Sequence, residues 1–253
     1  MNGQRQNTLS LFLCIIVAFS TKDAYSADLR YGVTSDLVWM ESNHLVQTLG
    51  ALVELQPGIF RLPLRWGVVE PTQGQWNFSR VDSVVSQVPQ TTEIMGILLH
   101  TPTWANGVDP SEITGWPEAY MPTNLTAWSN YVFKVVDRYG ARIKYWEVLN
   151  EPNGRDYFRP EPDPVLFTTL LKLAYGAINR ANTNCFAVLG GLQGNGVDPF
   201  VFEPVPVTNF LENVYLAGGK DYFDICATHP YVPWQQGQRK PHCGIWSPVF
   251  SAT

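Results

Sequence analysis

A short apolar run with the composition of a β-strand returns six times along this chain of 253 residues, at spacings of about 30 to 50 residues. The predicted strands cover residues 29–34, 59–66, 94–100, 143–149, 186–191 and 223–228. Helical patterns lie between most of them, and no internal repeat or second domain interrupts the alternation. Such an order is typical of a βα barrel. The sequence therefore predicts an α/β fold, a TIM (β/α)8-type barrel that is incomplete, with about six βα units.

Start signals accompany several of the predicted helices. Ser79 and Asp82 have the spacing of a capping box. Asp163 precedes Pro164 in the pattern of an N-cap followed by proline in the first turn. Three further helix starts are predicted at Ser42, at Asn124, and at Thr208 or Asn209.

The fourth predicted strand ends abruptly in polar residues. Asn150 and Glu151 follow its apolar part directly, and Pro152 cannot continue a hydrogen-bonded strand. In a barrel of parallel strands, side chains at the carboxyl ends carry the chemistry. Taken alone, a glutamate at this place could equally cap the next element, since short motifs have many false matches.

Three strand ends together resemble the clan A glycoside hydrolases, retaining (β/α)8-barrel enzymes that include families 5 and 39. The residues concerned are Asn150-Glu151-Pro152, Arg61-Leu62-Pro63 and His229-Pro230-Tyr231. The resemblance implies that Glu151 is the general acid/base and that Asn150 donates a hydrogen bond to the sugar 2-hydroxyl. It implies that Arg61 orients the catalytic carboxylates, and that His229 and Tyr231 contact the nucleophile and the sugar.

Two more segments fit the same clan. Residues 101–105 are similar to the loop after the third strand, which implies that Trp104 lines the cleft. His100 ends that strand at the same rim and is either a substrate contact or a structural histidine. Residues 70–78 are similar to a segment that follows the second strand, where Trp76 and Phe78 cover the rim and Glu70 has no catalytic role.

The second catalytic carboxylate has no candidate. Retaining cleavage uses two carboxyl groups about 5 to 5.5 Å apart. In this clan the nucleophile is a glutamate at the end of the seventh strand, but the sequence has no Asp or Glu after Asp224. Residues 243–250 imitate a seventh strand and offer Ser247 in its place. Glu147 lies too deep in the barrel to replace it, and we expect Glu147 to pair with Arg61.

Three interpretations remain open. The chain is a fragment or frameshifted gene product, a non-catalytic sugar-binding relative, or an enzyme completed by another chain. The function that the resemblance implies is the hydrolysis of O-glycosidic bonds in β-linked oligo- or polysaccharides by a retaining double displacement, and the alternative is an inactive or truncated carbohydrate-binding relative. Similarity of residues 209–231 to family 39 implies xyloside- or glucoside-type substrates. A barrel enzyme of another chemistry, with Glu151 as a simple base, fits the three strand ends least well.

The remaining expectations concern location and partners. Arg5, the apolar residues 9–19 and small residues near Ser26 form the pattern of a secretory signal peptide. We therefore expect a signal peptide at 1–26, a glycoside hydrolase barrel domain at 27–253, and a secreted protein, extracellular or periplasmic, with no membrane contact after cleavage. The net charge of −5 without a basic run argues against nucleic acid. No His/Cys cluster has zinc spacing, no cofactor is implied, and a disulfide is not favoured.

Overall fold

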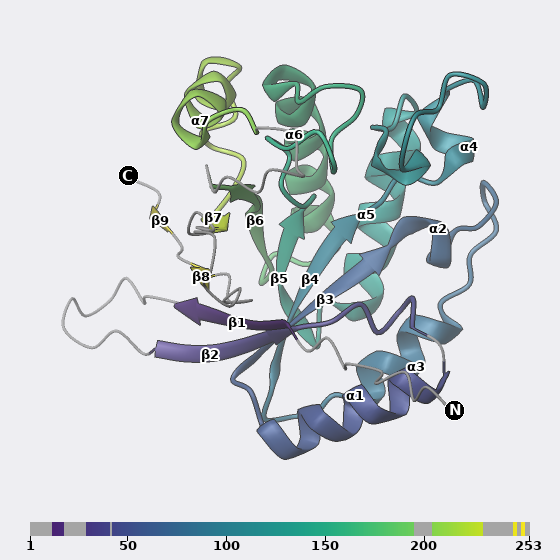
Figure 1. Ribbon diagram of the computed structural model, residues 1–253, viewed down its shortest axis with the longest axis vertical. Coiled ribbons are helices and arrows are strands. Elements are labelled where there is room, and N and C mark those ends of the chain that lie inside the picture. The colour runs from purple at the N-terminus through teal and green to yellow at the C-terminus, as the bar shows by residue number, and fades with distance from the viewer. Residues whose placement is uncertain are drawn as a thin grey trace, which may run out of the picture.

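The computed structural model describes residues 12–17, 29–40, 42–194, 204–229, 245–246 and 249–250. Its centre is one sheet of order β8-β1-β2-β3-β4-β5-β6-β7-β9 (Figure 1). The strands from β2 to β7 are all parallel to their neighbours. They comprise β2 (Leu29–Thr34), β3 (Ile59–Arg65), β4 (Glu93–Leu99), β5 (Ile143–Val148), β6 (Phe186–Gln193) and β7 (Ile225–His229). The predicted incomplete βα barrel is thus confirmed as a curled half-barrel.

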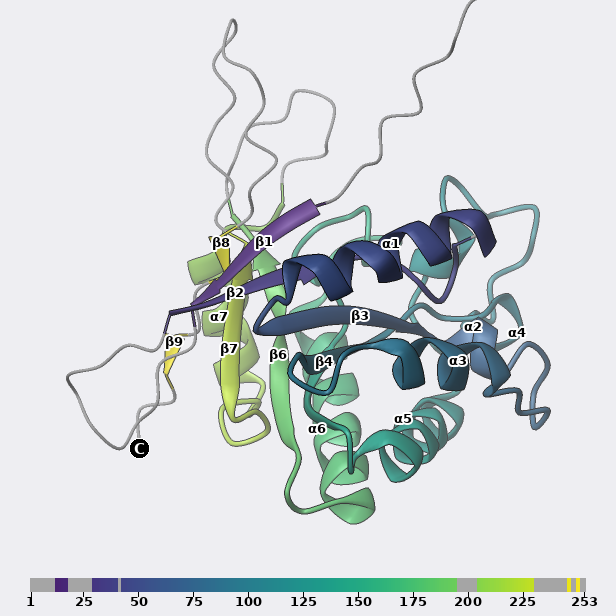
Figure 2. The same ribbon diagram turned by 90° about the horizontal axis from the view of Figure 1, so that it is seen from below.

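A helix follows each strand from β2 to β6 before the chain enters the next one. Figure 2 shows α1, α3, α5 and α6 along the outer side of the curved sheet. These connecting helices are α1 (Ser42–Leu55), α3 (Ser79–Gln87), α5 (Leu125–Tyr139), α6 (Pro164–Ala181) and α7 (Val207–Leu216). Short helices follow the carboxyl ends of β3 and β4, namely α2 (Trp66–Val69), α4 (Thr103–Asn106) and the 3-10 helix η1 (Pro117–Ala119). No helix among the described residues is both long and apolar enough to cross a bilayer.

Two of the predicted helix caps are confirmed and one is wrong. The Asn124 side chain accepts a hydrogen bond from the backbone of Ala127, and Asp163 accepts two at the start of α6. Asp82, however, does not cap α3. Its carboxylate binds the Arg138 guanidinium in two hydrogen bonds of 2.8 and 2.6 Å. A charged partner on α5 therefore replaces the local bond that the sequence predicted.

Successive side chains of β3 point to opposite faces of the sheet. Phe60, Leu62 and Leu64 face outward and are fully buried in the large core between sheet and helices. Trp128 and Tyr131 of α5 pack into this core with their polar atoms paired. The Trp128 indole donates to the backbone oxygen of Leu170, and the Tyr131 hydroxyl donates to that of Leu64. These bonds satisfy polar atoms that would otherwise be buried without a partner.

A second, smaller apolar cluster fills the inside of the half-barrel. Ile59, Met95, Val188 and Ala227 each come from a different strand and form its floor. The same inward side of β3 carries Arg61 and Arg65, which lie two and six residues further toward the carboxyl end than Ile59. The inner face therefore changes from apolar at the floor to charged at the rim.

The edges of the sheet differ from the sequence expectations. Phe12–Val17, which lies within the predicted signal peptide, forms β1 and pairs antiparallel with β2. The predicted imitation of a seventh strand is divided into β8 (Ile245–Trp246), parallel to β1, and β9 (Val249–Phe250), antiparallel to β7. A run this short with antiparallel pairing is not a seventh barrel strand. The signal peptide itself, and the division at residue 26, stay predictions.

Candidate active site

Glu151 stands at the carboxyl end of β5 in an unusual backbone conformation. Its φ is +46° and that of Leu149 is +64°, a region in which residues with a side chain are strained. The amide of Glu151 donates to the backbone oxygen of Gly191 on β6 at 3.0 Å. The residue is 5% exposed. The chain therefore turns sharply after β5 and places this carboxyl group inside the rim.

His229 holds the Glu151 carboxyl group from the neighbouring side. Its Nδ1 lies 2.6 Å from Oε1 of Glu151, and the histidine residue is 4% exposed. The ring rests on Gly191, where an added Cβ would overlap Nε2 of the imidazole. Glycine is therefore required at this place in β6 for the acid and the imidazole to meet. The clan resemblance implied that His229 contacts the nucleophile and the sugar, whereas here its partner is Glu151.

One layer below the rim, Arg61 and Glu147 form a buried ion pair. The guanidinium donates to both carboxylate oxygens, at 2.7 and 2.9 Å, and Glu147 has no exposed surface. The amide of Gly191 donates a further hydrogen bond of 2.9 Å to Glu147. The expected pairing of Glu147 with Arg61 is thus confirmed. This bidentate geometry fixes the height of both β3 and β5 inside the barrel.

Asn150 connects this ion pair to the rim. Its Oδ1 accepts a hydrogen bond of 2.7 Å from Nη2 of Arg61. Because the guanidinium can only donate, the amide oxygen must face it and the Nδ2 group must point the other way. Asn150 is partly exposed. Its amide nitrogen can therefore donate to a molecule bound above Arg61.

Tyr157 is a site residue that the sequence did not predict. Burial and the nearby Glu151 carboxylate raise the pKa of Tyr157 to about 12, while Arg61 and Arg65 act in the opposite direction. The phenol is therefore protonated at neutral pH and close to both the acid and the two guanidinium groups. Its position on the long loop after Glu151 was the available signal, since loops at this end of a barrel carry functional residues.

His100 and Trp104 lie apart from this hydrogen-bonded group. His100 is largely buried, and burial together with the charge of Arg65 lowers its pKa to about 3, so that the imidazole is neutral at physiological pH. The Trp104 indole packs edge-on against Trp66 at 5.4 Å and donates to the backbone oxygen of Glu70. Trp104 thus makes structural contacts, and its predicted place in the cleft stays a prediction.

The Glu70 carboxylate makes structural hydrogen bonds, as expected. Its carboxylate accepts hydrogen bonds from the Trp66 indole at 2.7 Å and from the amide of Gly74 at 2.8 Å. Trp76 and Phe78 of the same segment stack on each other at 5.9 Å. Tyr231, the last predicted site residue, lies outside the described residues.

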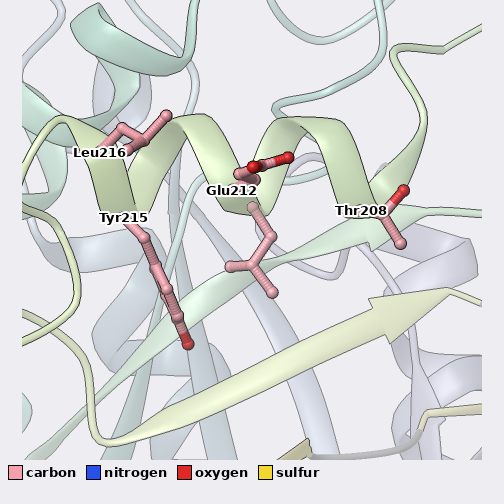
Figure 3. Close-up of a pocket in the computed structure, with 5 residues that line it drawn as sticks. Thr208, Glu212, Tyr215 and Leu216 are labelled. Atoms are coloured by element: carbon pink, nitrogen blue, oxygen red, sulfur yellow. The ribbon is translucent and has the colours of Figure 1, made fainter.

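Other features of the described surface carry less chemistry. A hollow of about 460 Å³ runs along α7 and is lined by Thr208, Leu211, Glu212, Tyr215 and Leu216 (Figure 3). It holds one carboxylate, that of Glu212, and its lining contains no basic side chain. In the described part of the chain no group of three or more His, Cys, Asp or Glu side chains could hold a metal ion. Cys185 and Cys226 are buried free thiols.

Part of the chain is similar in sequence to known proteins. A model of glycosyl hydrolase family 10 matches residues 62–162, a segment that includes Asn150 and Glu151. An Arabidopsis thaliana protein described as "Endo-1,4-beta-xylanase 5-like" is 29% identical over 119 residues, which cover 46% of this chain and 20% of that protein. The chain thus spans about a fifth of the length of this relative.

Solved structures show the same fold over a larger part of the chain. A family 39 glycoside hydrolase from Bacteroides cellulosilyticus WH2 is 23% identical with a TM-score of 0.56, covering 79% of this chain and 38% of that one. A monomeric β-xylosidase from Caulobacter crescentus CB15 is 17% identical with a TM-score of 0.59, covering 87% and 45%. The chain has the clan A glycoside hydrolase fold in the form of a partial barrel. The predicted resemblance to clan A is thus confirmed, with family 39 among the similar structures and family 10 as the matching family model.

Proposed function

We propose that this protein cleaves O-glycosidic bonds in β-linked oligo- or polysaccharides, with Glu151 as the general acid/base. The observation that carries the proposal is the contact of Glu151 with His229 at the end of β5. This contact between Glu151 and His229 lies directly above the Arg61–Glu147 ion pair, whose arginine holds Asn150. The comparisons support the carbohydrate substrate class, because the similar proteins are glycoside hydrolases.

Each side chain has a definite task in this proposal. Glu151 gives its proton to the departing glycosidic oxygen and later takes one from the incoming water. His229 fixes the rotamer of that carboxyl group, so that the proton is delivered in one direction. Asn150 donates its amide hydrogen to a sugar hydroxyl, and this bond strengthens as positive charge develops on the ring. Arg61 and Glu147 keep Asn150 and Glu151 in register without touching the sugar.

The second half of a retaining mechanism needs a group that attacks the anomeric carbon. No Asp or Glu follows Asp224 in the sequence, and Glu147 is occupied by Arg61 and Gly191. A small added anion can stand in for this attacking group. The names of the similar proteins, a xylanase and a xylosidase, favour β-xylosides as first substrates.

An aryl glycoside assay with an added anion tests this function. The protein is incubated with 4-nitrophenyl β-xyloside or β-glucoside in the presence of sodium azide. Azide attacks the anomeric carbon, the bond from that carbon to the phenolic oxygen breaks, and Glu151 supplies the proton to the released phenol. We expect azide-dependent release of nitrophenol and formation of the α-glycosyl azide. Full activity of a Glu151→Gln variant on an aryl β-xyloside with a weakly acidic phenol, which needs a proton in order to leave, would rule out this role for Glu151.

A second function, sugar binding without turnover, is favoured by the same missing carboxylate. In that case the protein is retained on a column of xylan or another β-linked polysaccharide but releases no nitrophenol with or without azide. Retention combined with inactivity would select this alternative over hydrolysis. The absence of nucleic-acid binding and the absence of a cofactor stay predictions.

We also propose that the protein is secreted after removal of residues 1–26. The supporting observation is the pattern of Arg5, an apolar run and small residues near Ser26. Mass spectrometry of the mature amino terminus tests this directly. A terminus that still contains Phe12–Val17 would contradict the proposal, since that segment would then remain in the sheet as β1.

A further inference from the structure

Trp39 is a large apolar side chain that the structure leaves 62% exposed. It lies on the turn that follows β2, at the carboxyl end of the strands, where the Glu151 site also lies. Other exposed apolar side chains, such as Val46 and Leu216, belong to the surfaces of helices α1 and α7. The place of Trp39 at the rim therefore calls for a separate explanation.

The turn that carries Trp39 is held firmly. Its neighbours Leu37 and Val38 are buried, with 0% and 3% exposure. From α3, Arg80 donates hydrogen bonds to the backbone oxygens of Leu37, Val38 and Met40. The indole is thus presented on a fixed support, and binding to it would cost little conformational entropy.

One face of the indole is covered by a cation. The Arg65 guanidinium carbon lies 4.8 Å from the Trp39 ring centroid and 5.6 Å from that of Trp116. Asp36 and Glu118 hold the same guanidinium at 2.6 and 3.0 Å. This arrangement fixes the plane of the indole through cation–π contact and two ion pairs.

Aromatic contacts connect Trp116, which lies beside Arg65, with the surroundings of Glu151. Trp116 lies 6.1 Å from Tyr157, whose pKa responds to the Glu151 carboxylate. Trp116 also contacts His100 at 4.2 Å between ring centroids. Both ring nitrogens of His100 are buried and have no hydrogen-bond partner among the described residues. Polar atoms of this kind are normally paired, which points to a ligand with hydroxyl groups beside Trp116.

We propose that Trp39, fixed on Arg65, is a sugar-binding platform for a ring beyond the one that Glu151 acts on. This inference rests on the proposed function and extends it, because it makes the substrate an oligosaccharide rather than a single glycoside. The apolar face of a pyranose ring packs on an indole, whose face is electron-rich, while its hydroxyl groups reach polar atoms at the edges. The partly exposed carboxylate of Glu118, which also holds Arg65, supplies such an atom on the inner side of the platform.

The test compares sugar chains of increasing length. The Kd values of β-1,4-xylo-oligosaccharides and β-1,4-gluco-oligosaccharides with one to six units are measured by calorimetry for the whole protein and its variants. We expect Trp39→Ala to weaken binding of the longer chains about tenfold and to leave single sugars unchanged. Trp39→Phe should restore most of this loss, because it keeps an aromatic face. Tyr215→Ala, which removes an exposed aromatic side chain from α7, is the matched control and should have no effect.

The possible results distinguish the proposed Trp39 platform from the proposed function on which it rests. Equal affinity of the unchanged protein and Trp39→Ala for the longest chains would overturn the platform and leave the proposed function standing. A loss that is the same for one unit and for six would also overturn it, since the tryptophan would then act through the fold. If the unchanged protein binds no sugar of any length, both the platform and the proposed function fail.

Discussion

Nδ1 of His229 lies 2.6 Å from Oε1 of Glu151, although 78 positions separate the two residues in the sequence. The contact depends on three adjacent strands. β5 carries Glu151, β7 ends in His229, and β6 passes between them with Gly191 beneath the imidazole. The position of the acid is therefore a property of the half-barrel rather than of the Asn-Glu-Pro sequence alone.

Replacing Gly191 by alanine should separate this pair. The new methyl group would occupy the space of the His229 ring, which must then move away from Glu151. We expect azide-dependent cleavage of phenyl β-xyloside, whose weakly acidic phenol needs a proton in order to leave, to fall at least about tenfold, at a cost in unfolding free energy of about 1–3 kcal/mol. Activity assays and urea unfolding of the same samples measure the two effects.

Gly50→Ala is the matched control for that substitution. Gly50 lies on the exposed side of α1, and nothing lies within 4 Å of an added Cβ. Alanine should raise the unfolding free energy by about 0.5–1 kcal/mol at this helical position and leave cleavage unchanged. Equal activity of the Gly191 and Gly50 variants would show that the His229 contact has no part in catalysis.

The Arg61–Glu147 ion pair should behave as a strongly coupled unit. Arg61→Met leaves a carboxylate with no exposed surface and without its cation, which should lower the unfolding free energy by about 3–5 kcal/mol. Adding Glu147→Gln removes that charge while keeping an acceptor for the Gly191 amide. We expect the double variant to be at least as stable as Arg61→Met alone. Additive losses in a double-mutant cycle by urea unfolding would contradict direct coupling.

His100 should make the stability depend on pH. Its pKa is lowered from 6.5 to about 3 by burial and by Arg65, so the folded protein keeps the imidazole neutral where the unfolded chain binds a proton. The stabilisation is therefore complete above pH 6.5 and is lost as the pH falls toward 3. Relative to His100→Leu, the unfolding free energy should drop by about 1.4 kcal/mol per pH unit below 6.5.

This comparison is cleanest between pH 6.5 and 5, where most carboxylates stay ionised in both states. Urea unfolding of the wild-type protein and His100→Leu at several pH values in this range gives the difference directly. A difference that does not change with pH would mean that the imidazole is as easily protonated in the folded protein as in the unfolded chain.

Glu70 should affect stability without affecting chemistry. Its two carboxylate oxygens accept hydrogen bonds from Trp66 and Gly74, and Gln at this position would turn a donor toward one of them. We expect Glu70→Gln to cost about 1–3 kcal/mol of unfolding free energy and to retain cleavage by the folded fraction. Glu54→Gln, at an exposed position, is the control and should change neither quantity. A fully folded but inactive Glu70→Gln protein would assign Glu70 to the active site.

Local sequence was sufficient to place the strands. Leu29–Thr34 was predicted with both ends correct, and the prediction for β3 began at Ile59 and ended one residue late. These runs are short, apolar and bounded by turn residues, which makes the period-2 pattern easy to locate. Side-chain parity also sufficed to predict the pairing of Arg61 with Glu147.

Long-range partners could not be predicted in the same way. Asp82 had a local capping pattern, but a guanidinium on a neighbouring helix is a stronger partner for its carboxylate. His229 faces Glu151 because strand register and Gly191 permit it, and neither can be read from single residues. Trp39 had no sequence signal, since its exposure depends on how Arg65 and Arg80 hold the turn.

The dependence of cleavage on the leaving group tests proton donation by Glu151 most directly. Azide-dependent rates are measured for a series of aryl β-xylosides whose phenols range from strongly to weakly acidic, with the wild-type protein and with Glu151→Gln. Weakly acidic phenols need a proton in order to leave, and strongly acidic phenols do not. Our account predicts that Glu151→Gln slows cleavage of the former by about 100-fold or more and barely changes the latter. An equal effect of the substitution across the series, or none at all, would contradict it.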